Sequence, residues 1–179
     1  YDLTGVPELN TSVVRLTPGS TYYPSTYLTP ENADTAKPVS TAEFDALRAE
    51  YLSQRFVLLF PDNSDAYTLT FRLSGRHAMR VYVNGRLAGQ TGILGTTKQD
   101  TEVWENNITV HASAVNGKMD ILLNSAQFYH AKRGASLAEL RLGEQNAATD
   151  PFAADRIQGL LVMGALLCAA VSLLGIYFL

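Results

Sequence analysis

The chain has 179 residues, of which 46% are hydrophobic, and it carries a formal net charge of −3. This length suits one globular domain with an appendage, and the lack of a basic patch argues against nucleic acid as a partner. The single cysteine, Cys168, excludes a disulfide framework and a cluster of thiolate metal ligands. Because the chain starts at Tyr1 and stops inside an apolar run at Leu179, we expect a cleaved leader before it and more protein after it.

Residues 1–39 form a segment rich in Thr, Pro, Tyr and Ser. Turn-forming residues recur every few positions in "LTPGSTYYPSTYLTPENADTAKP", which predicts loops with short extended pieces that pack on the following domain. A short helix is predicted next, over residues 41–52. Ser40 and Glu43 have the spacing of a capping box, and apolar residues then repeat at helical spacing.

Residues 40–143, which include this helix, are predicted to form a β-sandwich. From Arg55 onward the hydrophobic period is two, and turn residues separate the runs "RFVLLF", "YTLTFRL", "MRVYV", "RLAG", "EVWENNITV", "KMDILL" and "LAELRL". In the second run, residues 67–73, one face is apolar and the other carries Thr68 and Thr70. This alternation predicts a half-buried strand.

A β-hairpin is predicted at Asn84-Gly85, between the runs "MRVYV" and "RLAG". A two-residue turn of type I′ needs positive φ at both central residues, and Asn followed by Gly adopts this conformation readily. The pair therefore marks the tip of a hairpin within the sandwich.

Residues 144–150 are predicted to be a linker, and residues 151–179 a transmembrane helix. Asp150 and Pro151 supply an N-cap followed by proline at the first helical position. Residues 157–179 contain no charged residue, and a bilayer core needs about 20 apolar residues. A buried core helix is the alternative. A linker this short can pass a displacement from the sandwich to the helix.

Small residues follow one face of the predicted transmembrane helix. Gly164, Cys168, Ser172 and Gly175 fall on one stripe at the helical period. Small side chains let membrane helices approach closely, which favours packing in a bundle. A single anchor with no helical partner stays open as the alternative.

The sequence carries no motif for catalysis or for a metal site. A nucleophile elbow, a P-loop and an HExxH motif are absent, and His77, His111 and His130 lack the spacing of metal ligands. We therefore expect no catalytic residue, metal or cofactor in this chain.

A carbohydrate site is hypothesised from aromatic, amide and charged residues. In sugar-binding sandwiches a ring stacks on the C–H face of the sugar, and polar groups take the hydroxyls. The candidates are Trp104, Tyr129, His130, Arg133, Asn124 and Arg80. Some have structural alternatives, because Trp104 can be a core residue, Asn124 can hydrogen-bond a loop, and Arg133 with Gly134 can form a turn.

Longer stretches resemble known families. "YTLTFRLSGRHAMRVYVNGRLAGQTGILG" resembles galactose-binding-like jelly-roll domains, including the sugar-binding domains of β-glycosidases. Together with "LTPGSTYYPSTYLTPEN", "DILLNSAQFYHAKRGASLAELRLG" and the apolar run, the order is similar to the N-terminal region of bacterial seven-transmembrane receptors with diverse intracellular signalling modules. The resemblance implies an extracytoplasmic jelly roll, helices in the bacterial cell membrane, and a cytoplasmic histidine kinase, nucleotide cyclase or phosphatase.

The receptor resemblance also implies structural roles for individual residues. It assigns Asn84, Gly85 and Gly92 to the hairpin, Asn124 to the end of a late strand, and Gly134 and Gly143 to turns around the last strand. The family often has a tryptophan after an early glycine, whereas Gly19 is followed here by Ser20.

The sequence therefore predicts a mainly β protein, a galactose-binding-like jelly-roll sandwich with one short helix, followed by a single transmembrane helix. The expected function is extracytoplasmic sensing of a carbohydrate or other small ligand by a membrane receptor. The expected partners are the bilayer, further membrane helices of the same protein and, in a homodimer, a second copy. Two alternatives are a membrane-anchored interaction or oligomerisation module and the accessory sugar-binding domain of an anchored glycosidase.

Overall fold

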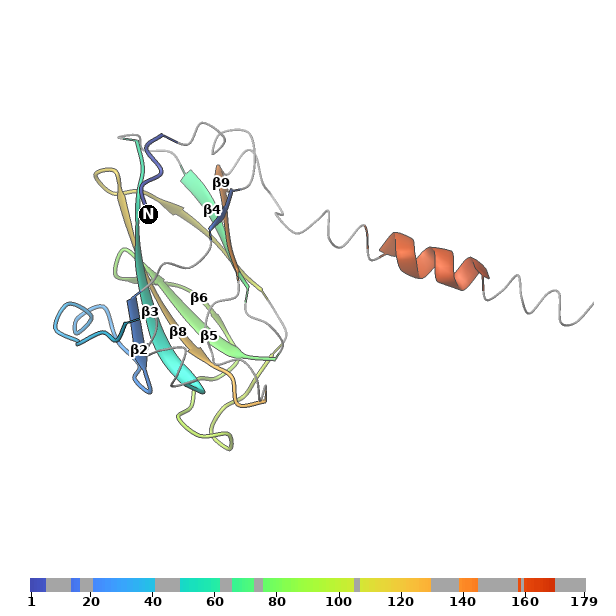
Figure 1. Cartoon of the computed structure of the whole chain (residues 1–179), viewed down its shortest axis with the longest axis horizontal. Coiled ribbons are helices and arrows are strands. Elements are labelled where there is room, and N and C mark those ends of the chain that lie inside the picture. The colour runs from blue at the N-terminus through green and yellow to red at the C-terminus, as the bar shows by residue number, and fades with distance from the viewer. Residues whose placement is uncertain are drawn as a thin grey trace, which may run out of the picture. The chain divides into compact units, whose positions relative to one another are not determined.

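The structure is a computed structural model that describes residues 1–5, 14–16, 21–40, 49–61, 66–72, 76–104, 107–129, 139–144, 158 and 160–169. The chain divides into two compact units, Tyr1–Ala148 and Thr149–Leu179. Within the described residues, the first unit is a sandwich of two antiparallel sheets (Figure 1). The expectation of a mainly β domain is therefore confirmed.

The strand order of the two sheets is that of a jelly roll. One sheet has the order β1 (Val14–Leu16), β9 (Glu139–Glu144), β4 (Ala66–Arg72) and β7 (Ile108–Ser113). The other has the order β2 (Thr21–Pro24), β3 (Tyr51–Leu59), β8 (Lys118–Ala126), β5 (Ala78–Val83) and β6 (Arg86–Thr91). From β3 to β9 the chain changes sheet after every strand except β5, which forms a hairpin with β6. This alternation pairs strands that are distant in sequence, as in double Greek-key sandwiches.

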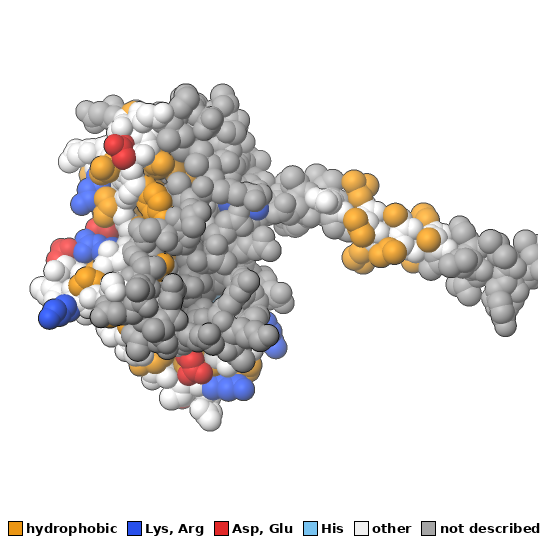
Figure 2. Space-filling model, viewed as in Figure 1, with side chains coloured by type: hydrophobic (Ala, Val, Ile, Leu, Met, Phe, Trp, Pro, Cys, Tyr) orange, Lys and Arg blue, Asp and Glu red, His pale blue; other side chains and the backbone are white. Residues whose placement is uncertain are grey.

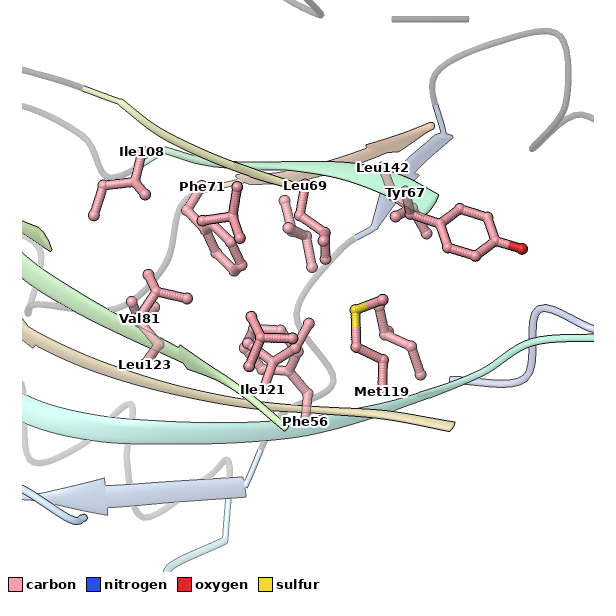
Figure 3. Packing of buried hydrophobic residues seen from close by; sticks show 14 of the residues in the cluster. Phe56, Tyr67, Leu69, Phe71, Val81, Ile108, Met119, Ile121, Leu123 and Leu142 are labelled. Atoms are coloured by element: carbon pink, nitrogen blue, oxygen red, sulfur yellow. The ribbon is translucent and has the colours of Figure 1, made fainter. Parts of the chain in front are cut away.

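The core lies between the two sheets. Figure 3 shows Leu69, Phe71 and Leu142 from the four-stranded sheet pointing toward Phe56 and Ile121 from the five-stranded sheet. Each of these side chains is buried. Burial of one such side chain contributes about 1.5–3 kcal/mol, so the alternating apolar residues of the strands largely determine the fold.

Two Asn-Gly turns connect neighbouring strands. Asn84 (φ 49°) and Gly85 (φ 78°) join β5 to β6, with positive φ at both central residues as the sequence predicts. Asn116 (φ 52°) and Gly117 (φ 68°) form a second turn of this kind between β7 and β8, which the prediction did not include. Both turns match the right-handed twist of their strands.

Gly92 and Gly143 have different environments. Gly92 has φ 67°, and an added Cβ would collide with the carbonyl oxygen of Glu102. Gly143 was expected in a turn, and this expectation is wrong, because it lies inside β9 opposite Thr68. The β9 ladder continues as far as Glu144, so Gly143 does not end the strand. Gly134 lies outside the described residues.

The segment 1–39 contains short extended pieces, as the sequence predicts, and these are β1 and β2, one strand for each sheet. The short helix after this segment differs from the prediction. The predicted helix over residues 41–52 does not reach Leu52, because β3 begins at Tyr51 and pairs with β8 along its whole length. These cross-strand hydrogen bonds and the full burial of Leu52 outweigh the local helical pattern. Residues 41–48 lie outside the described residues.

The expected half-buried character of β4 is also wrong. Thr68 and Thr70 are 1% and 0% exposed, although they occupy the polar face of the strand. β4 lies between β9 and β7, and its hydroxyls are paired with polar side chains. The Thr68 hydroxyl lies 3.0 Å from His111 Nδ1, and that of Thr70 lies 3.2 Å from the Thr109 hydroxyl.

The described part of the second unit is helical at Gln158 and over residues 160–169. Its large apolar side chains are exposed, and they are orange in Figure 2. No helix within the described residues is long and apolar enough to cross a membrane. Residues 145–157 and 170–179, which hold most of the predicted linker and span, lie outside the described part, so the transmembrane helix stays a prediction.

The predicted stripe of small residues is described only in part. Gly164 has open space where a Cβ would lie, and Cys168 is exposed. Ser172 and Gly175 lie outside the described residues.

Candidate functional site

Two half-exposed aromatic side chains lie at one end of the five-stranded sheet, where β8 ends and β5 begins. Trp104 is 49% exposed, and its backbone pairs with His77, the residue before β5, through hydrogen bonds of 2.9 and 3.2 Å. Tyr129 is 50% exposed and follows the end of β8. Because β5 and β8 are neighbours in the sheet, both rings lie at the same end. We call Trp104, Tyr129, Lys98 and Glu102 the aromatic end.

Each exposed ring has a charged partner. The indole N–H of Trp104 donates a 3.0 Å hydrogen bond to Glu102 Oε1. The ammonium of Lys98 lies 4.7 Å from the centroid of the Tyr129 ring, which is a cation–π distance. The two rings are therefore oriented by polar groups, while about half of each residue remains exposed to solvent.

The loop that carries Lys98 is held by hydroxyl groups. Thr97 donates to Asp100 Oδ2 at 2.6 Å, and Thr101 donates to the Thr97 carbonyl at 2.7 Å. Ile93 and Glu102 close the base of the loop with two backbone hydrogen bonds. These hydrogen bonds hold the backbone of Glu102 in place. Residues two positions apart in an extended chain face the same side, so the Glu102 side chain lies beside that of Trp104.

Tyr27 connects this loop to the loop that follows β2. Its hydroxyl donates a 2.8 Å hydrogen bond to the Gly95 carbonyl. Burial raises the pKa of the Tyr27 phenol above its ordinary value; Tyr51 raises this pKa further, and the nearby Arg80 opposes the shift. The phenol therefore remains a hydrogen-bond donor at neutral pH.

An aromatic row supports the segment that precedes Tyr129. The ring centroids of Tyr27 and Tyr51 are 5.2 Å apart, and those of Tyr51 and Phe128 are 6.4 Å apart. Such tilted pairs contribute about 0.5–1.5 kcal/mol each beyond the burial of their area. The row thus anchors Phe128, the residue directly before Tyr129.

Asn124 is a structural residue, which corrects its place among the candidate ligand-binding residues. It is buried, its Nδ2 donates to the Leu28 carbonyl at 2.8 Å, and its Oδ1 accepts from the Ser53 hydroxyl at 2.6 Å. Both ends of the amide are thus bonded inside the protein. The alternative that Asn124 hydrogen-bonds the loop after its own strand is wrong, because its loop partner, Leu28, follows β2 rather than β8.

The other candidates separate into described and undescribed residues. Arg80 lies opposite Asn124 in the β5–β8 ladder, and its Nε donates to Gln90 Oε1 at 3.1 Å. Trp104 is not a core residue, because it is 49% exposed. His130 and Arg133 lie outside the described residues.

The sequence prediction omitted Lys98 and Glu102. Glu102 accepts the indole hydrogen bond of Trp104. Its position two residues before Trp104 was the available signal, since such residues share a face in an extended chain. Among the described residues, no group of three or more His, Cys, Asp or Glu side chains could hold a metal ion.

No family model matches the chain, and no curated protein matches it in sequence. Similar solved structures include a GH2 β-galacturonidase from Eisenbergiella tayi bound to glycerol, with 12% identity, a TM-score of 0.45, and coverage of 74% of this chain and 24% of that one. The Faecalibacterium prausnitzii β-glucuronidase has 16% identity, a TM-score of 0.41 and coverage of 68% and 22%.

A further similar structure is a family 35 carbohydrate binding module from Clostridium thermocellum. It has 14% identity, a TM-score of 0.32, and coverage of 73% of this chain and 90% of that one. The chain spans about a quarter of the length of the β-galacturonidase and of the β-glucuronidase.

Proposed function

We propose that the sandwich binds carbohydrate at the aromatic end, with Trp104 and Tyr129 as stacking surfaces. The observation that carries the proposal is the half-exposure of both rings at the same end of one sheet. Large aromatic side chains gain free energy from burial, so two of them held open beside charged groups are typical of a binding surface.

The surrounding groups suit the chemistry of a sugar. A sugar presents an apolar C–H face and a rim of hydroxyls that both donate and accept. The rings supply the apolar contact, Lys98 supplies a donor, and Glu102 supplies an acceptor. Oε2 of Glu102 has no hydrogen-bond partner among the described residues, so it can accept from a sugar hydroxyl without breaking the bond to Trp104.

The proposal is tested with the full chain in detergent on a glycan array. Trp104→Ala and Tyr129→Ala should each weaken binding about tenfold, which corresponds to about 1.4 kcal/mol of lost stacking. Leu87→Ala is the matched control, because Leu87 is 57% exposed but lies in β6 next to the Asn84-Gly85 turn. Undiminished glycan binding by the folded Trp104 and Tyr129 variants would contradict the proposal.

We further propose that this domain is the extracytoplasmic sensor of a bacterial membrane receptor. The support is the uncharged run 157–179 and the receptor-like order of sequence stretches. In this proposal a membrane helix over residues 151–179 couples the sandwich to a cytoplasmic output module. A ligand can drive such a receptor only by binding its two states unequally.

Two measurements test the receptor proposal. Cys168 is the only cysteine, so a charged maleimide should label it in the detergent-unfolded chain but not in intact membranes. Hydrogen exchange over residues 143–155 should change when the bound glycan saturates the sandwich. Labelling of Cys168 in intact membranes, or unchanged exchange at saturation, would contradict membrane coupling.

The same experiments separate the two alternative functions. An interaction module predicts oligomers of the chain that Trp104→Ala dissociates, with no glycan binding. An accessory domain of an anchored glycosidase predicts glycan binding without any change of exchange over residues 143–155. The two alternatives therefore differ in whether the chain binds glycan.

A further inference from the structure

A concave site lies on the outer face of the five-stranded sheet, away from the aromatic end. Its volume is about 130 Å³. Arg55 of β3, Leu122 of β8 and Tyr82 of β5 form one lateral row of its floor, because Leu122 is opposite both of the others in the ladders. Asp120 and the turn residue Gly85 complete the floor. We call this site the outer pocket.

The loop between β2 and β3 forms the roof of the outer pocket through Pro30, Ala33 and Asp34. Two buried side chains clamp the start of this loop, since Asn124 donates to the Leu28 carbonyl and the Ser53 hydroxyl accepts from the Leu28 N–H at 2.8 Å. The roof is therefore built into the fold. A preformed site loses little conformational entropy when a ligand enters it.

An ion-pair network occupies one wall. Arg55 Nε and Nη2 donate to the two carboxylate oxygens of Asp120 at 3.0 and 2.6 Å, and Nη1 donates to Asp34 Oδ1 at 2.6 Å. Asp34 is 79% exposed, so this last contact lies at the mouth of the pocket. The guanidinium is thus fixed in one orientation by two carboxylates.

Donors and acceptors both remain available in this wall. Arg55 has one further N–H on each of Nη1 and Nη2, and the described residues offer no acceptor for either one. Asp34 Oδ2 and the Tyr82 hydroxyl likewise have no hydrogen-bond partner among the described residues. The remaining lining is apolar and comes from Pro30, Ala33 and Leu122.

We propose that the outer pocket binds the diol edge of one neutral sugar ring or a similar small polyol. A small cation in the pocket would be repelled by the guanidinium of Arg55, and a small anion would be repelled by the carboxylate of Asp34. Vicinal hydroxyls instead match a mixed set of donors and acceptors, and their carbon skeleton matches the apolar wall. This site goes beyond the proposed function and does not require the aromatic end to bind.

The size of the outer pocket agrees with such a ligand. A volume of about 130 Å³ is smaller than the roughly 300–1,000 Å³ of pockets that hold drug-sized ligands. The outer pocket therefore suits a fragment with a few hydroxyls rather than a drug-sized molecule. A contact of this size gives affinity in the millimolar range.

The test uses the full chain in detergent micelles with ¹³C-labelled alanine and leucine methyl groups. Ala33 and Leu122 report on the outer pocket, while the fluorescence of Trp104 reports on the aromatic end. The probes are D-glucose, D-galactose, D-xylose and glycerol, with methylammonium and acetate as charged probes. We expect a saturable shift of the Ala33 and Leu122 methyl signals with at least one neutral probe and with neither charged probe.

Two variants identify the polar contact. Asp34→Asn removes an exposed carboxylate and should weaken this saturable shift about tenfold, the loss of one charge-assisted hydrogen bond. Asp2→Asn is the control, because Asp2 is also exposed but its carboxylate accepts hydrogen bonds from Thr4, outside the pocket. Equal weakening by both variants would overturn the assignment to Asp34.

The result also distinguishes this site from the aromatic end. A change in Trp104 emission with unshifted Ala33 and Leu122 signals would overturn the outer pocket and leave the proposed function intact. Saturable methyl shifts without a change at Trp104 would support the outer pocket alone. Saturable shifts with methylammonium or acetate would overturn the assigned ligand class.

Discussion

Asn84 and Asp120 are joined by two hydrogen bonds in opposite directions. The backbone N–H of Asn84 donates to the Asp120 carbonyl at 2.8 Å, and the backbone N–H of Asp120 donates to Asn84 Oδ1 at 2.9 Å. Asn84 Nδ2 also donates to the Ser113 carbonyl at 3.1 Å. The tip of the β5–β6 hairpin is thereby fixed to β8 and β7, and Asp120 in turn binds Arg55. Asn84 therefore both forms the turn and links the two sheets.

The first prediction separates these two roles. Asn84→Gly keeps the positive φ but removes both side-chain hydrogen bonds, so it should lower the free energy of unfolding by about 1–2 kcal/mol. Asn116→Gly is the matched control, because Asn116 has nearly the same φ, 52°, in an equivalent turn and is exposed. It should change stability by less than about 0.5 kcal/mol. Urea unfolding measures both, and equal effects would show that the turn conformation alone matters.

The second prediction concerns Asn124. Asn124→Ala leaves the buried Leu28 carbonyl without its donor, so the free energy of unfolding should fall by about 1–3 kcal/mol. The amide of Leu28 should also exchange faster, since the loop after β2 loses a clamp. Arg80→Ala, at the facing position in β5, is the control and should cost less than about 1 kcal/mol. A fully stable Asn124→Ala variant that has lost glycan binding would instead make Asn124 a ligand-binding residue.

The third prediction is a pH dependence at Tyr27. Its phenol pKa is raised by burial above the ordinary value of 10.0, so the folded state holds this proton more tightly than the unfolded state. The resulting stability is fully present below pH 10.0 and is lost as the pH rises through the raised pKa. Tyr27→Phe should therefore lose stability less steeply than the wild type above this pH, as measured by urea unfolding. If the stability of the wild type and of Tyr27→Phe fell in parallel as the pH rises, the raised pKa could not belong to Tyr27.

The fourth prediction concerns the close approach of β6 and β7. A Cβ added at Gly89 would lie 2.5 Å from Ile108 Cγ2, so Gly89→Ala should cost about 1–3 kcal/mol. Adding Ile108→Ala should recover part of this cost, because the two changes couple through one contact. Gly5→Ala is the control, since nothing lies within 4 Å of its added Cβ. Additive effects at Gly89 and Ile108 would show that the strands do not meet there.

The sequence predicts much of the fold because its signals are local. Period-two runs place β4, β5, β6 and β8, and the Asn84-Gly85 pair places the hairpin. The same signal at Asn116-Gly117 also predicts a turn, although it was not interpreted as one. Tyr51 and Leu52 could not be assigned to a strand locally, because their extended conformation depends on pairing with β8.

The candidate site is less predictable than the fold. The exposure of Trp104 depends on its isolated bridge to His77, the residue before β5, and the burial of Asn124 depends on a hydrogen bond to Leu28 in the loop after β2. The burial of Thr68 and Thr70 likewise depends on the strands on both sides of β4. These are properties of tertiary contacts, which alternation along one strand does not encode.

The central claim, that the aromatic end stacks on a sugar, is tested most directly by the fluorescence of Trp104 in the full chain. Trp104 is the only tryptophan, so the emission reports on this ring alone. Titration with a glycan that binds should shift the emission to shorter wavelength and protect the ring from acrylamide quenching. Binding detected by calorimetry with unchanged emission and unchanged quenching would contradict the claim.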